Sequence, residues 1–207
     1  MGEYIVLVSG NLASGKTTFI HNLSACLNWH SVVESVIDNP YLSDFYADMR
    51  SWAFHLQVYF LGCRVQQYLE ACTQSQSCFV DRSVYEDAHV FAPALHSRGF
   101  ISDRDYAAYM RVFKLLEQHL RMPDAVIYLH ARHDVLLDRI RRRGLSCDSA
   151  INESYLGLID DYYGRWVRSL TIPIVDFDTT EWDLQHTPQT LDRIVTTLFN
   201  VLQHVHL

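Results

Sequence analysis

The chain has 207 residues, a length that suits one well-buried domain or at most two very small ones, and we expect a single domain over residues 1–207. Hydrophobic residues make up 49% and charged residues 20%, with only 8 Gly and 5 Pro, which excludes collagen-like, linker-like and low-complexity proteins. A formal net charge of −7 argues against general binding to nucleic acid or to a membrane surface.

Two kinds of segment alternate along the chain. Short apolar, β-branched runs predict buried strands at 4–9, 31–34, 78–81, 125–130 and 172–177. Longer segments with apolar residues three and four apart predict helices at 15–27, 52–72, 103–120, 134–143, 152–170 and 188–205. This alternation predicts a three-layer α/β fold in which helices flank both faces of a five-stranded parallel sheet. No apolar run approaches the ~20 residues of a transmembrane helix.

The cysteine pattern indicates a reducing compartment. Five cysteines are an odd number, and no C-x-x-C pair occurs among them. The pattern therefore argues against a disulfide framework and against a zinc site. We expect a cytoplasmic protein.

A phosphate-binding motif directly follows the first predicted strand. Residues 10–17 read Gly-Asn-Leu-Ala-Ser-Gly-Lys-Thr, which fits the P-loop pattern G-x-x-x-x-G-K-[ST] between a strand and a helix. Backbone N–H groups and the helix N-terminus would face the phosphates, Lys16 would reach the β- and γ-phosphates, and Thr17 would bind Mg²⁺. The residues expected to bind the phosphates are Gly10, Asn11, Leu12, Ala13, Ser14, Gly15, Lys16, Thr17 and Thr18.

Charged residues end two further predicted strands. Glu34 ends the second strand, and Asp81 with Arg82 ends the third. The carboxyl edge of an open α/β sheet is where ligands bind. Two carboxylates and a cation there suit phosphoryl transfer to a hydroxyl. A GTPase is disfavoured because the one lysine outside the P-loop, Lys114, is not in an Asn-Lys-x-Asp segment.

Five motifs in order resemble the deoxynucleoside kinases, in particular their bacterial deoxyadenosine/deoxyguanosine/deoxycytidine kinase branch. They are the P-loop, Glu34 with Asp38-Asn-Pro-Tyr41, Trp52-Ala-Phe-His-Leu-Gln57, Asp81-Arg-Ser83, and Arg139-Ile-Arg-Arg-Arg143-Gly144. The resemblance covers nearly the whole chain and implies a P-loop kinase-like fold.

The resemblance implies a set of catalytic residues. Glu34 matches the general base that accepts the proton of the nucleoside 5′-hydroxyl, and Arg82 matches an arginine that contacts the 5′-oxygen and phosphate. Together with Lys16 these are the expected catalytic residues. Asp81 matches an acidic position associated with Mg²⁺, which it would share with Thr17.

The resemblance also implies a nucleoside pocket. Gln57 would pair with the base, Tyr46 and Asp148 would contact the sugar 3′-hydroxyl, and Phe91 would pack on the base; Glu34 and Arg82 complete the pocket at the 5′ end. Arg64 and Asp87 match positions that accompany use of a purine or deoxycytidine. From the residues alone, Arg64 and Asp87 read as a surface ion pair and Phe91 as a core aromatic.

A cluster of arginines precedes Gly144 and predicts a lid over about 139–149. Arg139 and Arg143 are four residues apart and share a helix face, which suits two cations closing over the triphosphate. A solvated basic face is the alternative. The family commonly has a further arginine where this chain has Leu145, so either Arg141 or Arg142 replaces it or turnover suffers.

The expected reaction is phosphorylation of a deoxynucleoside 5′-hydroxyl by ATP with Mg²⁺, a salvage step that gives the 5′-monophosphate. Deoxyadenosine or deoxyguanosine is the expected acceptor, and deoxycytidine stays open. The alternatives are a nucleoside monophosphate kinase of the thymidylate type and a noncatalytic nucleotide-binding switch. The family implies a homodimer through helices 52–72 and 103–120, although apolar faces on these helices fit a monomer core equally well.

Overall fold

A parallel sheet forms the centre of the computed structural model, which describes residues 3–33, 39–144, 151–181 and 188–203. The described residues contain the strands β1 (Ile5–Gly10), β2 (His30–Val32), β3 (Cys78–Asp81), β4 (Ala125–His130) and β5 (Ile174–Asp178). Their order is β2-β3-β1-β4-β5, and every neighbouring pair is parallel. The predicted five-stranded parallel sheet is confirmed, and the central strand β1 leads into the P-loop.

The long helices lie close to their predicted positions: α1 (Lys16–Leu27), α3 (Met49–Thr73), α6 (Asp103–Glu117), α7 (His133–Arg143), α8 (Glu153–Ser169) and α9 (Pro188–Leu202). The short elements α2 (Leu42–Ala47), α4 (Val84–Glu86), the π-helical turn η1 (Asp87–Phe91) and α5 (Ala92–Ser97) were not predicted. The strand predicted at 172–177 was placed too early, because β5 begins at Ile174. None of the described helices is long and apolar enough to span a membrane.

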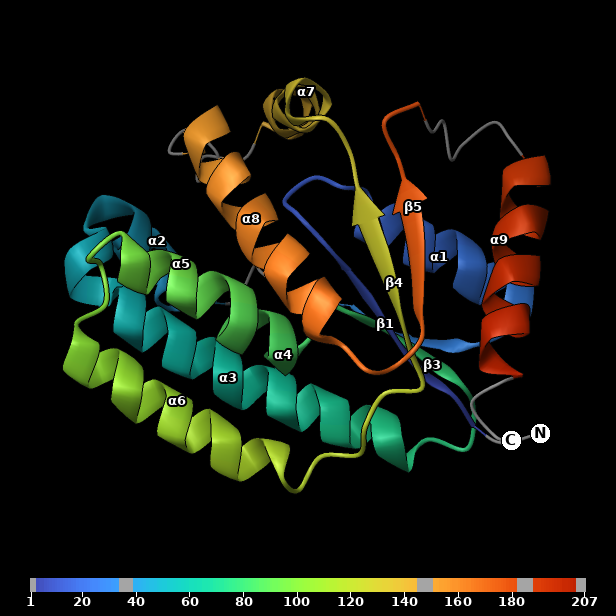
Figure 1. The fold of residues 1–207 in the computed structure, drawn as a ribbon, viewed down its shortest axis with the longest axis horizontal. Coiled ribbons are helices and arrows are strands. Elements are labelled where there is room, and N and C mark those ends of the chain that lie inside the picture. Colours follow the sequence, from blue (N-terminus) through green and yellow to red (C-terminus); the bar gives the residue numbers. More distant parts are fainter. Residues whose placement is uncertain (1–2, 34–38, 145–150, 182–187, 204–207) are drawn as a thin grey trace.

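Successive side chains of β1 point alternately into two apolar layers, one on each face of the sheet. Ile5 and Leu7 point into the layer with α3, α6 and α8, whereas Val6 and Val8 point into the layer with α1 and α9. Figure 1 shows these helices on the two faces of the sheet. All four side chains are at most 1% exposed, and burying each contributes about 1.5–3 kcal/mol. Because a shift of one residue would exchange the two faces, this burial fixes the register of β1 and hence the position of the P-loop.

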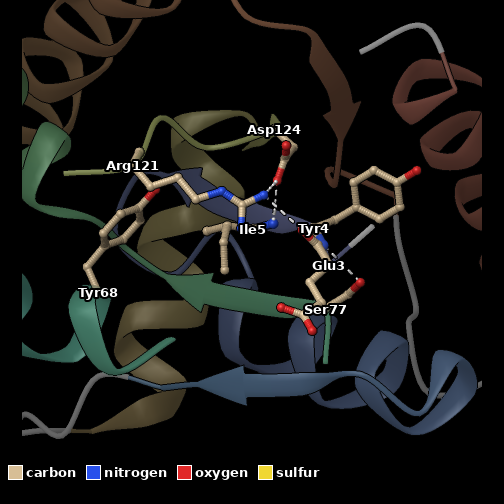
Figure 2. Close-up of polar contacts among 7 residues, drawn as sticks. All are labelled: Glu3, Tyr4, Ile5, Tyr68, Ser77, Arg121 and Asp124. Carbon is tan, nitrogen blue, oxygen red and sulfur yellow. Dashed lines mark hydrogen bonds and ion pairs between the residues drawn. The ribbon is translucent and has the colours of Figure 1, made fainter. Parts of the chain in front are cut away.

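The other end of β1 is held by a buried carboxylate. Asp124 Oδ2 accepts hydrogen bonds from the backbone N–H of Ile5 at 2.7 Å and from Arg121 Nη2 at 2.9 Å, as Figure 2 shows. The same Arg121 nitrogen donates to the carbonyl of Glu3 at 2.8 Å, and the Tyr68 hydroxyl donates to the carbonyl of Arg121. Asp124 thus connects the first strand to the loop before β4.

Replacing Asp124 tests this connection. We expect Asp124→Ala to lower the free energy of unfolding by about 1–3 kcal/mol, because the buried N–H of Ile5 loses its acceptor. Asp124→Asn keeps an acceptor oxygen and should lose less. Asp161→Ala, on the exposed side of α8, is the control. Urea unfolding of the three variants measures the difference, and equal stability of Asp124→Ala and Asp161→Ala would contradict the prediction.

Candidate active site

The P-loop adopts a conformation that requires glycine where it leaves the sheet. Gly10 has φ 148°, and a Cβ there would lie 2.1 Å from the carbonyl oxygen of Leu129 on β4. Gly15, just before α1, has φ 95°, and Ala13 has φ 58° although it is not glycine. The loop therefore turns tightly between β1 and α1 while remaining close to β4.

Lys16 is held inside this turn. Its Nζ donates to the carbonyl of Gly10 at 2.7 Å and to the carbonyl of Asn11 at 2.9 Å, and the residue is 8% exposed. The ammonium group thus lies at the centre of the loop, close to the N-terminus of α1. A cation and a helix N-terminus at one point form a site for phosphate oxygens.

The two residues expected to bind Mg²⁺, Thr17 and Asp81, lie in contact beside the loop. The Thr17 hydroxyl donates to Asp81 Oδ2 at 2.7 Å, and Asp81, at the end of β3, is 5% exposed. Hydroxyl and carboxylate oxygens fit Mg²⁺, which usually keeps several ligands from water and phosphate. The described residues contain no cluster of three or more His, Cys, Asp or Glu side chains suited to a metal.

Arg82 has a strained backbone directly after Asp81. Its φ is 63°, and its N–H donates to the carbonyl of Val8 at 3.2 Å. Positive φ at a non-glycine residue costs about 1–2 kcal/mol and needs support from its surroundings. Ser83 and Glu86 supply part of this support, because they form a capping box at the start of α4, directly after Arg82. The guanidinium lies over the ring of Phe91, 4.4 Å from its centroid, so Phe91 supports Arg82.

The predicted base-binding residues come together on α3 and η1. Arg64 and Asp87 form an ion pair whose side chains are 4% and 2% exposed, so the reading as a surface pair was wrong. Gln57 lies two turns before Arg64 on α3 and is 3% exposed, and no hydrogen-bond partner for its Oε1 occurs among the described residues. A buried amide oxygen of this kind costs free energy unless a ligand satisfies it. Tyr46 lies half-buried on α2, next to the ring of Phe45.

The two predicted lid arginines have different surroundings. Arg139 donates to the carbonyl of Thr179 at 2.6 Å and to its hydroxyl at 3.1 Å, and partial burial lowers the pKa of the guanidinium. The Thr179 hydroxyl also lies 3.0 Å from the carbonyl of Ser14, so Arg139 is held next to the P-loop. Arg143 is exposed at the end of α7. Glu34, Asp148 and Leu145 lie outside the described residues.

Helix α8 contributes residues that the sequence reasoning missed. The Tyr163 hydroxyl lies 2.8 Å from the carbonyl of Gly10 and 2.7 Å from Glu86 Oε1, and burial raises the pKa of Tyr163 well above its usual value. Asp160 contacts Asn11 and His133. The Ser-x-x-Glu spacing at 83–86 could have indicated the cap formed by Glu86. Tyr163 and Asp160 have no such local signal.

The sequence comparisons agree with this geometry. The family model described as "Deoxynucleoside kinase" matches residues 6–203. The chain belongs to the deoxynucleoside kinase family. A deoxyadenosine kinase of Dictyostelium discoideum is 35% identical over 86% of this chain and 73% of its own length. A deoxyadenosine/deoxycytidine kinase of Bacillus subtilis is 30% identical over 96% of this chain and 93% of its own length.

A solved structure extends the similarity to three dimensions. The deoxyadenosine kinase from M. mycoides, solved with the products dCMP and a flexible dCDP bound, superposes with a TM-score of 0.84 at 25% identity. The match covers 95% of this chain and 100% of that chain. The predicted P-loop kinase-like fold and the predicted family are therefore confirmed, and the chain is a deoxynucleoside kinase.

Gly10 offers a direct test of the loop geometry in this kinase. We expect Gly10→Ala to lower the free energy of unfolding by at least about 2 kcal/mol, because the new methyl group would overlap the Leu129 carbonyl. Gly62→Ala is the control, since a Cβ on Gly62 in helix α3 meets nothing within 4 Å and should stabilise the helix by about 0.5–1 kcal/mol. Thermal unfolding measures both, and two variants of equal stability would refute the assignment of Gly10.

Proposed function

We propose that this kinase transfers the γ-phosphate of ATP to the 5′-hydroxyl of a deoxynucleoside in an Mg²⁺-dependent reaction. The proposed acceptors are deoxyadenosine and deoxyguanosine first, with deoxycytidine as a further substrate. The observation that carries the proposal is the buried Gln57 amide, whose oxygen has no partner among the described side chains, two turns from the buried Arg64–Asp87 pair. The names of the two relatives support deoxyadenosine and deoxycytidine among these acceptors.

The polar groups of the pocket suit a base that carries an amino group. The Gln57 amide offers an acceptor and a donor side by side, which complements the edge of adenine or cytosine. Turned over, the same amide offers its donor to the carbonyl of guanine. Asp87 adds a carboxylate acceptor, which its ion pair with Arg64 keeps ionised inside the protein. Thymine presents no amino group to these acceptors.

The charge of the pocket favours a neutral acceptor over a nucleotide. A nucleoside monophosphate kinase needs unneutralised cations to bind the acceptor phosphate. In this chain Arg64 is already paired with Asp87, and both side chains are almost fully buried. This pairing supports a nucleoside as the acceptor and disfavours the thymidylate-kinase alternative.

The proposed catalytic roles rest on these positions and, for Glu34, on the resemblance to the family. We assign Lys16 and Arg82 to the charge of the transferring phosphoryl group and Glu34, outside the described residues, to the proton of the 5′-hydroxyl. Thr17 and Asp81 would hold Mg²⁺, which would neutralise charge on the phosphate oxygens. Phe91 would contact the base while supporting Arg82.

The remaining contacts concern the sugar and the lid. Tyr46 would contact the sugar 3′-hydroxyl, together with Asp148, which lies outside the described residues. Arg139 and Arg143 would belong to a lid over about 139–149 within a single domain of residues 1–207. Arg139, already next to the P-loop carbonyls, would reach the phosphates with little movement.

The outer faces of α3 and α6 support a homodimer. Val58 and Leu69 on α3 are 44% and 46% exposed, and Val112 and Leu115 on α6 are 50% and 60% exposed. The two helices lie side by side in Figure 1 and are in contact, and we propose that these side chains contribute to one apolar surface. A second copy of the chain would cover this apolar surface.

We also propose that the kinase works in the cytoplasm on small-molecule partners only. Cys26, Cys63, Cys72 and Cys78 are free thiols, which fits a reducing compartment.

A substrate panel tests the proposed reaction. With ATP and Mg²⁺, we expect deoxyadenosine and deoxyguanosine to be phosphorylated most efficiently and thymidine least. Gln57→Leu should lower kcat/KM for deoxyadenosine about a hundredfold, because two hydrogen bonds to the base are lost. Gln66→Leu, which alters an exposed amide on the same helix, is the control. Efficient use of thymidine, or equal activity of the two variants, would contradict the assignment of the base site.

The oligomeric state tests the proposed dimer. Wild-type protein should sediment as a dimer in analytical ultracentrifugation. Leu115→Asp should shift it toward the monomer, because a carboxylate would enter the apolar contact. Met122→Asp changes another exposed apolar residue, beyond the end of α6, and should leave the dimer intact. A wild-type monomer would refute the dimer.

A further inference from the structure

Three side chains from separate elements connect the P-loop to the start of helix α7. Asp160 lies in the middle of α8 and accepts two hydrogen bonds, one on each oxygen. Oδ1 accepts from Asn11 Nδ2 of the P-loop, and Oδ2 accepts from His133 Nε2, each at 2.5 Å. The contact between His133 and Asp160 fits the histidine tautomer whose Nε2 carries the proton, with a carboxylate oxygen as the acceptor.

On the P-loop side, every polar atom of the Asn11 side chain is used. Nδ2 also donates to the carbonyl of Leu156 at 3.0 Å, and Oδ1 accepts from the N–H of Leu12 at 2.7 Å. Asn11 is 1% exposed, so the side chain has a single well-defined orientation. Its own carbonyl is one of the two that hold Lys16 Nζ. The orientation of Asn11 therefore sets the backbone that surrounds the lysine.

On the α7 side, the contact with Asp160 lies next to Gly157 of α8. His133 is the first residue of α7, and a Cβ added to Gly157 would lie 3.5 Å from its Cε1, an ordinary van der Waals contact. The start of α7 therefore packs closely against α8 at this point. Farther along the helix, Leu136 and Ile140 pack against Leu12 and Ala13 of the P-loop. Helix α7 also carries Arg139, so the contact with Asp160 fixes one end of the helix that presents this arginine.

We infer that Asp160 is a positioning residue for the triphosphate site, acting on the P-loop through Asn11 and on α7 through His133. It aligns two parts of the site that belong to different elements, the turn around Lys16 and the helix that bears Arg139. The inference deepens the proposed function, because it rests on the use of this loop for ATP. It predicts an effect on the phosphate donor that is separate from any effect on the nucleoside.

The central comparison is between neighbouring aspartates of α8. Asp160→Ala and Asp161→Ala remove the same charge from the same helix, but Asp161 is exposed. We expect Asp160→Ala to raise KM for ATP and the Kd for ADP, measured by calorimetry, about tenfold or more, since hydrogen bonds to a charged group are lost. KM for the deoxynucleoside should stay within about twofold. Asp161→Ala should match wild type in all three values.

Two further variants separate the two contacts. Asp160→Asn keeps an oxygen for Asn11 Nδ2 and should recover much of the ATP and ADP affinity. His133→Ala should raise KM for ATP less than Asp160→Ala, because the contact between Asp160 and Asn11 remains. In the Asp160→Ala background, His133→Ala should add almost nothing. If Asp160→Ala fails to fold, the ADP affinities of Asp160→Asn and His133→Ala test the role of Asp160 instead.

Defined results would overturn the inference. One is an ADP affinity and an ATP KM of Asp160→Ala within twofold of Asp161→Ala. Another is an equal rise in KM for both substrates accompanied by a lower melting temperature, which would indicate a general structural role. If Asp160→Ala does not fold, a wild-type ADP affinity of His133→Ala would also overturn the inference. A different result would refute the proposed reaction, namely that the wild-type protein phosphorylates no deoxynucleoside. The ADP affinities of the Asp160 and Asp161 variants would still test the role of Asp160 in that case.

Discussion

The carbonyl of Gly10 is the point on which the rest of the site depends. It terminates the central strand, lies against β4, and is contacted by Lys16 Nζ at 2.7 Å and by the Tyr163 hydroxyl at 2.8 Å. Because the tyrosine hydroxyl has one proton and also lies 2.7 Å from Glu86, it donates to only one of its two acceptors at a time. The Gly10 carbonyl therefore has two donors within reach, Lys16 Nζ and the Tyr163 hydroxyl.

The cations in the two parts of the site have different kinds of partner. Around the P-loop, Lys16 and Arg139 donate hydrogen bonds to backbone carbonyls. In the proposed nucleoside pocket, Arg64 is paired with Asp87. A net charge of −7 is therefore compatible with the proposed binding of a polyanion at one place and an uncharged nucleoside at another. Breaking the buried pair by removing either partner would leave an uncompensated charge, which costs about 3–5 kcal/mol.

Local patterns in the sequence predicted the parts of the structure that are themselves local. Strands and long helices were found from apolar periodicity, and the P-loop from its glycines and its single lysine, because each pattern lies within one element. The position of Asp81 near the P-loop was expected because parallel strands bring their carboxyl ends to one edge, and the structure places it in contact with Thr17. The role of Glu34 is still a prediction. The turn η1 was missed because its π-helical i→i+5 hydrogen bonds interrupt the usual helical spacing.

Contacts between distant elements escaped the sequence reasoning for a different reason. Asp160 and Asn11 are 149 positions apart, and nothing near either residue specifies the other. The exposure of the Arg64–Asp87 pair was misjudged because burial depends on α6 covering that face of α3, which periodicity in α3 alone cannot show. Such positions depend on tertiary packing, so they become visible only after the helices have been placed.

The strained residues of the described chain gather where these contacts are densest. Of its three non-glycine residues with positive φ, Asn28 ends α1, while Ala13 lies in the P-loop and Arg82 follows β3. The strain at Ala13 and Arg82 is offset by contacts already present in the protein alone, from α7 and α8 to the loop and from Ser83 and Glu86 to α4. A loop that is already curved around Lys16 has little backbone entropy left to lose when phosphates bind. The energetic cost of shaping the site is therefore met during folding, and more of the binding energy of the nucleotide remains for the reaction.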